Sequence, residues 1–120
     1  MEKAVYISLL FDFFGPLLTE KQQQYIDLYY NDNLSLSEIA ENDGISRQGV
    51  RDILVRAEAT LLDTEKKTGL AARHAALLKQ AEEAEGYLTE IARLNASRFK
   101  NAALLALCNQ LQAKLEEMKL

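Results

Sequence analysis

The amino-acid sequence predicts an all-α protein with a helix-turn-helix head over residues 1–70 and a C-terminal helical dimerisation segment over residues 71–120. Three observations support this fold class. The 120 residues include one proline and five glycines and are rich in Leu, Ala, Glu, Lys and Gln, which favour helices. Apolar residues recur at helical spacing along most of the chain. Residues 36–54 have the spacing of a helix-turn-helix.

The first 32 residues predict two helices. Residues 3–14 form the first, and Gly15-Pro16 ends it because the residue before a proline avoids helical geometry. Thr19 opens the second with the capping-box sequence TEKQ, and this helix extends to about Asp32. We expect one buried side of the first helix to carry Val5, Leu9, Leu10, Phe13 and Phe14. We expect the inner face of the second to carry Tyr25, Ile26, Leu28 and Tyr29.

Residues 35–69 predict a short helix, a turn and a long helix. Ser35 begins a second capping box, SLSE, and the short helix stops near Asn42 before a turn at Asp43-Gly44. Ser46 caps the long helix, and Gly69 follows its last residue as a C-terminal glycine. The expected packed face of the long helix is Val50, Ile53, Leu54, Ala57 and Leu61.

Residues 71–120 predict two further helices with a joint near Asn95–Ser97, although Gly86 is a competing position. Each helix carries a seam of apolar residues at heptad spacing. The seams are Leu77, Ala81, Ala84, Leu88 and Ile91, followed by Leu104, Cys108, Leu111, Leu115 and Met118. A 70-residue head cannot cover both seams, so we expect a homodimer. The alternative is that the seams fold back onto the head of the same chain.

The helix-turn-helix prediction depends on several residue types at fixed positions. Ala40 is small where the two helices come closest, and Gly44 supplies the positive φ of a tight turn. Both are expected to be buried in the turn between the helices. The residues expected to fill the wedge between the helices are Ile39, Ile45, Val50 and Ile53. An ordinary corner between two helices, with Ala and Gly serving packing alone, remains the alternative.

The same pattern predicts the surface that meets a nucleic acid or another partner. Ser46 caps the second helix and leaves Arg47, Gln48 and Arg51 facing outward, where a recognition helix meets base edges. Arginine suits guanine and glutamine suits adenine. Lys21 is a further candidate for a phosphate contact. The alternative is that these side chains only solvate an exposed helix face.

The charge distribution opposes strong binding to DNA. Residues 1–70 carry seven basic and twelve acidic side chains, whereas residues 71–120 carry seven basic and six acidic ones. A protein that grips DNA phosphates usually has a basic footprint, and here the head is acidic. We therefore expect duplex DNA binding to be weak and to be lost early as the salt concentration rises.

The composition excludes several other classes of protein. Cys108 is the only cysteine and His74 the only histidine, so we expect no disulfide within the chain, no metal site and no cofactor. The carboxylates form no recognisable catalytic pattern, which predicts that the protein is not an enzyme. Asp12 interrupts the apolar N-terminus, and no stretch is long enough to span a membrane. We expect a cytoplasmic protein.

Two resemblances narrow the prediction. The run from LLTEKQQQYIDLYY through LSLSEIAENDGISRQGVRDILVRAEATL resembles region four of bacterial sigma factors. The opening ISLLFDFFGPLLTEKQQQYIDLYYNDNLSLSEIAE resembles the YlxM family of small bacterial helix-turn-helix proteins more closely, over residues 1 to about 70. This resemblance implies an association with the signal recognition particle pathway and a regulatory role.

Two hypotheses about function follow, with one variant. The first is a regulatory protein of the signal recognition particle pathway that binds a nucleic acid or a ribonucleoprotein, the particle itself being the candidate, through its helix-turn-helix and C-terminal helices. The second is a sequence-specific DNA-binding transcriptional regulator that uses residues 46–51. In the variant, the fold serves as a protein-interaction module alone. The acidic head favours a partner-binding role, and the intact motif favours DNA.

Overall fold

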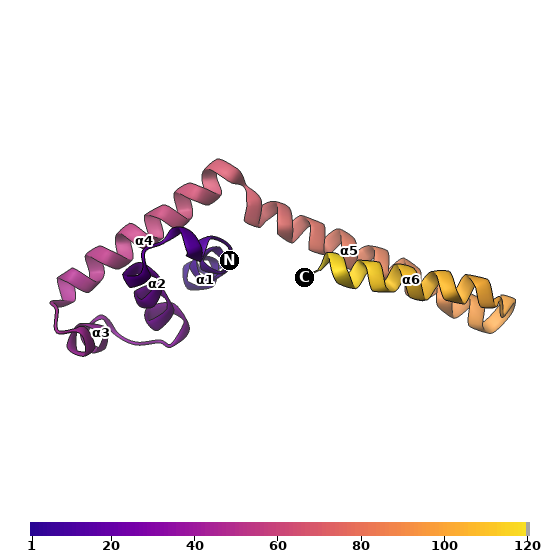
Figure 1. Cartoon of the computed structure of the whole chain (residues 1–120), viewed down its shortest axis with the longest axis horizontal. Helices are drawn as coiled ribbons and strands as arrows, with labels where there is room; N and C mark the ends of the chain where they lie inside the picture. Colours follow the sequence, from indigo (N-terminus) through magenta and orange to yellow (C-terminus); the bar gives the residue numbers. More distant parts are fainter. Residues whose placement is uncertain (120) are drawn as a thin grey trace. The chain divides into compact units, whose positions relative to one another are not determined.

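The computed structural model describes residues 1–119, and within that range it contains six α-helices and no strand (Figure 1). The chain divides into two compact units at Ala71/Ala72. Unit 1 is Met1–Ala71, and unit 2 begins at Ala72. No helix in residues 1–119 is both long and apolar enough to cross a membrane. The predicted all-α fold is confirmed.

Unit 1 is built around one long helix. The helices α1 (Lys3–Phe14), α2 (Glu20–Ile26) and α3 (Leu36–Asp43) all pack against α4 (Arg47–Thr68). A short 3-10 turn, η1 (Gly15–Leu17), follows α1, and a wider turn, η2 (Asp27–Asn31), extends α2. The largest side chains that are less than 2% exposed in this core are Tyr25, Ile7, Leu10, Ile26, Ile39, Leu61 and Val50.

The helix starts predicted from the sequence are confirmed. The side chains of Thr19 and Ser35 each accept a hydrogen bond from the backbone N–H of the third helical residue. In turn, the side chains of Gln22 and Glu38 accept from the backbone N–H of Thr19 and Ser35. Ser46 Oγ accepts from the N–H of Gly49 at 3.0 Å. These caps satisfy backbone donors that the first turn of a helix leaves free, and they fix where α2, α3 and α4 begin.

The predicted buried side of α1 is partly wrong. Leu10 and Phe14 are buried as expected, but Ile7 is the third buried residue and Val5 is 54% exposed. Leu9 and Phe13 are half-buried. The helix is apolar nearly all round, so its periodicity does not specify which side faces the core.

Unit 2 contains an antiparallel pair of helices. The part of α5 (Leu70–Leu94) from Ala72 onward and α6 (Ala102–Met118) lie side by side and are joined through η3 (Asn95–Phe99) (Figure 1). Asn95 is buried and holds the joint, because its amide exchanges two 2.9 Å hydrogen bonds with the backbone of Asn101. The joint predicted near Asn95–Ser97 is therefore confirmed, whereas the competing position, Gly86, lies inside α5.

The predicted seams of unit 2 are correct in part. Ala81, Leu88, Cys108 and Leu115 are buried as expected. Five other predicted seam residues are exposed, namely Leu77, Ala84, Ile91, Leu111 and Met118, and Leu104 is half-buried. Gln112 and Lys119 are half-buried instead, and Lys119 Nζ lies 2.8 Å from Glu85 Oε1. The stripe that packs within the hairpin is therefore rotated away from the most apolar stripe of α6.

Candidate nucleic-acid interface

A tight turn joins α3 to α4 and forms the centre of the helix-turn-helix. Gly44 ends α3 in the left-handed conformation, with φ +67° and ψ +32°, as the sequence predicts. The N–H of Ile45 bonds to the carbonyl of Ala40 at 3.2 Å, so the chain reverses directly after α3. Ser46 then caps α4. Left-handed geometry is cheap for glycine and strained for other residues, so Gly44 determines the path of the turn.

The wedge between α3 and α4 is filled by fewer residues than the sequence predicts. Ile39 and Val50 are fully buried, Ala40 is 6% exposed, and Ile53 is half-buried. The expectation that Gly44 and Ile45 are buried is wrong, because Gly44 is exposed and Ile45 is 40% exposed. The left-handed residue places both on the outer side of the turn.

Gly49 has a role that the sequence analysis missed. A Cβ added there would lie 3.2 Å from Ser46 Oγ and 3.6 Å from Ile45 Cδ1. The missing side chain therefore leaves room for the cap and for Ile45, which packs over the first turn of α4. No sequence pattern indicates this contact, because it depends on the direction in which Ile45 leaves the turn.

The first turns of α4 present the predicted contact residues to solvent. Arg47, Gln48 and Arg51 are all exposed. Gln48 Nε2 donates to Asp52 Oδ1 at 2.8 Å across one helical turn. Within residues 1–119, neither Arg47 nor Arg51 forms an ion pair. Two uncompensated guanidinium groups therefore lie at the start of this helix, where a phosphate or a base edge could meet them.

The surface beside these residues is shallow and mixed in character. A hollow is lined by Gln48, Arg51, Asp52, Val55 and Arg56, and the Val55 side chain is 50% exposed. An apolar group, two cations and a carboxylate thus lie within two turns of α4. Such a surface suits hydrogen bonding and apolar contact with a partner better than simple attraction to phosphate.

Lys21 is in a different position from the arginines. Its Nζ lies 2.9 Å from Asp43 Oδ2 and 5.6 Å from the centre of the Tyr25 ring, over which it makes a cation–π contact. The charge of Lys21 is thus already compensated within the head. Among the basic contact residues that were predicted, Lys21 is therefore paired, whereas Arg47 and Arg51 form no ion pair within residues 1–119.

Tyr25 and Asp43 join α2 to the end of α3, a contact that the sequence analysis did not anticipate. The buried Tyr25 hydroxyl donates to Asp43 Oδ2. Burial, reinforced by this bond, raises the pKa of Tyr25 to about 12. The hydrogen bond from Tyr25 and the bond from Lys21 lower the pKa of Asp43. The carboxylate thus holds the last turn of α3 directly before Gly44.

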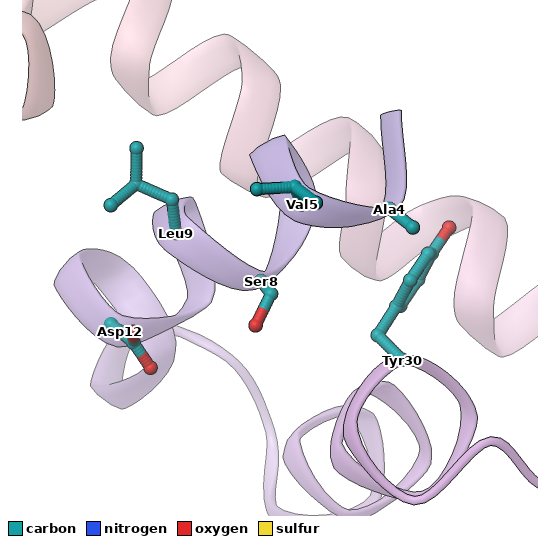
Figure 2. A pocket seen from close by; sticks show the side chains of 6 residues that line it. All are labelled: Ala4, Val5, Ser8, Leu9, Asp12 and Tyr30. Atoms are coloured by element: carbon teal, nitrogen blue, oxygen red, sulfur yellow. The ribbon is translucent and has the colours of Figure 1, made fainter. Parts of the chain in front are cut away.

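A second hollow lies elsewhere on unit 1, between α1 and η2. Figure 2 shows its lining side chains, Ala4, Val5, Ser8, Leu9, Asp12 and Tyr30. Ser8 donates to Asn31 Oδ1 at 2.8 Å, and the Tyr30 hydroxyl donates to Glu58. Burial and the bond to Glu58 raise the pKa of Tyr30. Tyr29 and Tyr30 stack edge to face at 5.0 Å beside the core, so these aromatic rings serve packing.

Comparison with known proteins identifies the family. A family described as "Putative helix-turn-helix protein, YlxM / p13 like" (UPF0122) matches residues 1–96. A UPF0122 protein of Symbiobacterium thermophilum is 45% identical over 106 residues, covering 88% of this chain and 98% of that protein. A UPF0122 protein of Limosilactobacillus reuteri is 41% identical over 117 residues, covering 98% of both chains. One from Thermoanaerobacter is 37% identical over 116 residues, covering 97% and 96%. The chain therefore belongs to the YlxM / p13-like family of helix-turn-helix proteins.

Proposed function

We propose that this protein is a regulatory protein of the signal recognition particle pathway that binds the ribonucleoprotein through Arg47, Gln48 and Arg51. The observation that carries the proposal is the pair of exposed guanidinium groups on the capped first turns of α4, neither of which forms an ion pair with another residue of 1–119. The pathway itself is what the resemblance to the YlxM family implies.

The charges around the arginines support a ribonucleoprotein over duplex DNA. Glu41 and Asp52 are exposed carboxylates on α3 and α4, whereas the carboxylate of Asp43 at the end of α3 is already paired with Lys21. A duplex carries a dense row of phosphates, so nearby carboxylates oppose a close approach. RNA loops instead offer unstacked bases, and guanidinium planes stack on them as well as bonding to their edges.

The DNA-regulator hypothesis retains one specific observation in its favour. The α3–turn–α4 geometry is that of a helix-turn-helix, and its exposed first turns carry Arg47, Gln48 and Arg51 at the positions that meet base edges in the major groove. Under this hypothesis the protein binds a specific duplex tightly at physiological salt.

A homodimer is part of the proposal. The C-terminal segment, residues 71–120, would join two heads, so that two sets of recognition residues act together. The support for this is the apolar surface that unit 2 leaves exposed.

An equilibrium binding experiment tests the proposal. The full chain is titrated against a labelled signal recognition particle, against its RNA alone and against random duplex DNA. The variant Arg47→Ala/Arg51→Ala is expected to bind the particle at least about tenfold more weakly, since a good arginine contact contributes roughly 1–3 kcal/mol.

A matched control removes the same charge from unit 2. Arg73 and Arg98 are exposed there, and Arg73→Ala/Arg98→Ala is expected to bind like the wild type. Equal binding of the particle by the wild type and the Arg47→Ala/Arg51→Ala variant would contradict the proposal. Nanomolar, site-specific binding to duplex DNA at physiological salt would favour the second hypothesis.

A further inference from the structure

Unit 2 has a small buried core and a large exposed apolar surface. Its buried cluster consists of Leu88, Cys108 and Leu115, with Ala92 half-buried against them. Two helices joined by so few buried side chains are marginal alone, because most helix stability comes from tertiary packing. The large apolar side chains of α5 and α6 that stay exposed within unit 2 are Leu77 (58%), Tyr87 (75%), Ile91 (46%), Leu105 (49%), Leu107 (61%), Leu111 (51%) and Met118 (66%).

Six of these seven exposed side chains lie at the same angular position around their helices, relative to the residues that face the other helix. Each residue turns about 100° around an α-helix. Tyr87 directly precedes the buried Leu88, and Leu107 directly precedes the buried Cys108. Leu77, Ile91, Leu111 and Met118 each precede a half-buried residue, namely Leu78, Ala92, Gln112 and Lys119. All except Leu105 are therefore rotated by about 100°, in the same sense around their helix, from the residues that face the other helix.

The antiparallel arrangement brings these positions onto one face of the hairpin. Lys119 Nζ lies 2.8 Å from Glu85 Oε1, so the end of α6 lies beside the middle of α5 (Figure 1). The second helix runs in the opposite direction and lies on the opposite side of the contact. Each of these two changes inverts the sense of rotation, so together they cancel. Positions one residue before the inward-facing ones therefore lie on the same face of the hairpin in both helices. This apolar face consists of Leu77, Tyr87, Ile91, Leu107, Leu111 and Met118.

The opposite face of the hairpin is polar. This face carries the residues that directly follow the inward-facing positions. Leu105 is the exposed large apolar side chain among them. The other side chains at these positions include Glu82, Thr89, Arg93, Asn109 and Glu116. Unit 2 is thus amphipathic as a pair of helices.

We infer that the apolar face packs against the same face of a second copy of this chain and forms a four-helix bundle. This inference rests on the homodimer in the proposed function and assigns its surface. With large side chains of roughly 150–250 Å², the face exposes on the order of 600 Å² of apolar area per copy. A standard interface buries about 800 Å² per partner, so this face with its polar rim is large enough for a stable dimer.

The near absence of charge on the face indicates what covers it. The positions of α6 that lie on this face are Leu107, Leu111, Lys114 and Met118, of which only Lys114 is charged. The positions of α5 on this face between Leu77 and Ile91 carry no charge. An almost uncharged apolar face can pack against a copy of itself without charge repulsion, and a two-fold axis pairs identical patches. A bundle of four antiparallel helices then encloses the residues that the hairpin alone leaves exposed.

Sedimentation velocity of the full chain at micromolar concentration tests the inference with matched leucines. Leu111 and Leu105 are 51% and 49% exposed but lie on opposite faces. The wild type and Leu105→Glu are expected to be dimers, whereas Leu111→Glu raises the dimer dissociation constant at least about tenfold. Tyr87→Lys and Thr89→Lys form a second pair with the same expectation. Circular dichroism of each variant checks that the helices persist.

The outcomes separate the surface from the dimer. A monomeric wild type overturns both the homodimer and the face. If the wild type is a dimer and Leu105→Glu weakens it as much as Leu111→Glu does, the homodimer stands but its assignment to the apolar face is wrong. Neither result depends on Arg47 or Arg51, whose contacts are measured in the binding experiment.

Discussion

Replacing Gly44 by alanine probes the turn that positions the recognition residues. Gly44 has φ +67°, and an added Cβ would meet nothing within 4 Å. The penalty is therefore confined to the backbone, where left-handed geometry costs an L-residue roughly 1–2 kcal/mol. Alanine also restricts the unfolded chain, which offsets about 0.4–1 kcal/mol. We predict that Gly44→Ala lowers the free energy of unfolding of unit 1 by about 1 kcal/mol.

Urea denaturation followed by tyrosine fluorescence measures this change in unit 1. Four of the five tyrosines lie in unit 1, namely Tyr6, Tyr25, Tyr29 and Tyr30. The midpoint should fall without a change in the denaturant slope. Gly44→Asn is the control, because asparagine tolerates left-handed geometry and should lose less stability than alanine. An alanine variant as stable as the wild type, or an asparagine variant less stable than the alanine one, would refute the reasoning.

Two further predictions concern the charge beside the turn and the joint of unit 2. The pKa of Asp43 in the folded protein is below its ordinary value of 3.8. The ionised carboxylate of Asp43 therefore stabilises the fold above pH 3.8, and this stabilisation is lost as the pH falls through the folded-state pKa. The stability difference between the wild type and Asp43→Asn should therefore shrink on acidification from neutral pH to pH of about 3, and a constant difference in urea midpoint would contradict this. Lys100 has φ +48° at the end of η3, so Lys100→Gly should stabilise unit 2 by about 0.5–1 kcal/mol. Thermal unfolding followed by circular dichroism measures it, with Arg98→Gly, inside the helical turn, as a destabilising control; an unchanged transition for Lys100→Gly would count against the strain.

Local signals in the sequence predicted the helix boundaries and the turn well. A capping box operates over three residues, so Thr19 and Ser35 could be assigned from sequence alone. The left-handed Gly44 follows from a similarly local requirement. The fold class depended on these signals and on the scarcity of Pro and Gly.

Long-range features could not be predicted in the same way. The Tyr25–Asp43 bond joins residues 18 positions apart, and no local pattern specifies it. The exposure of Ile45 depends on how the turn directs its side chain over Gly49. In α6, two adjacent stripes share heptad spacing. The stripe that packs against α5 continues to Lys119, directly after α6, whose ion pair with Glu85 is a tertiary contact.

The central claim is that Arg47 and Arg51 make the charged contacts with the ribonucleoprotein. The most direct measurement is the salt dependence of particle binding by the wild type and by Arg47→Ala/Arg51→Ala. Each neutralised phosphate contributes about −0.7 for single strands or −0.9 for duplex to the slope of log affinity against log salt. We predict that the wild-type slope is steeper than that of the variant by about 1.4–1.8, because two phosphate contacts are lost. Equal slopes for the two proteins would contradict it.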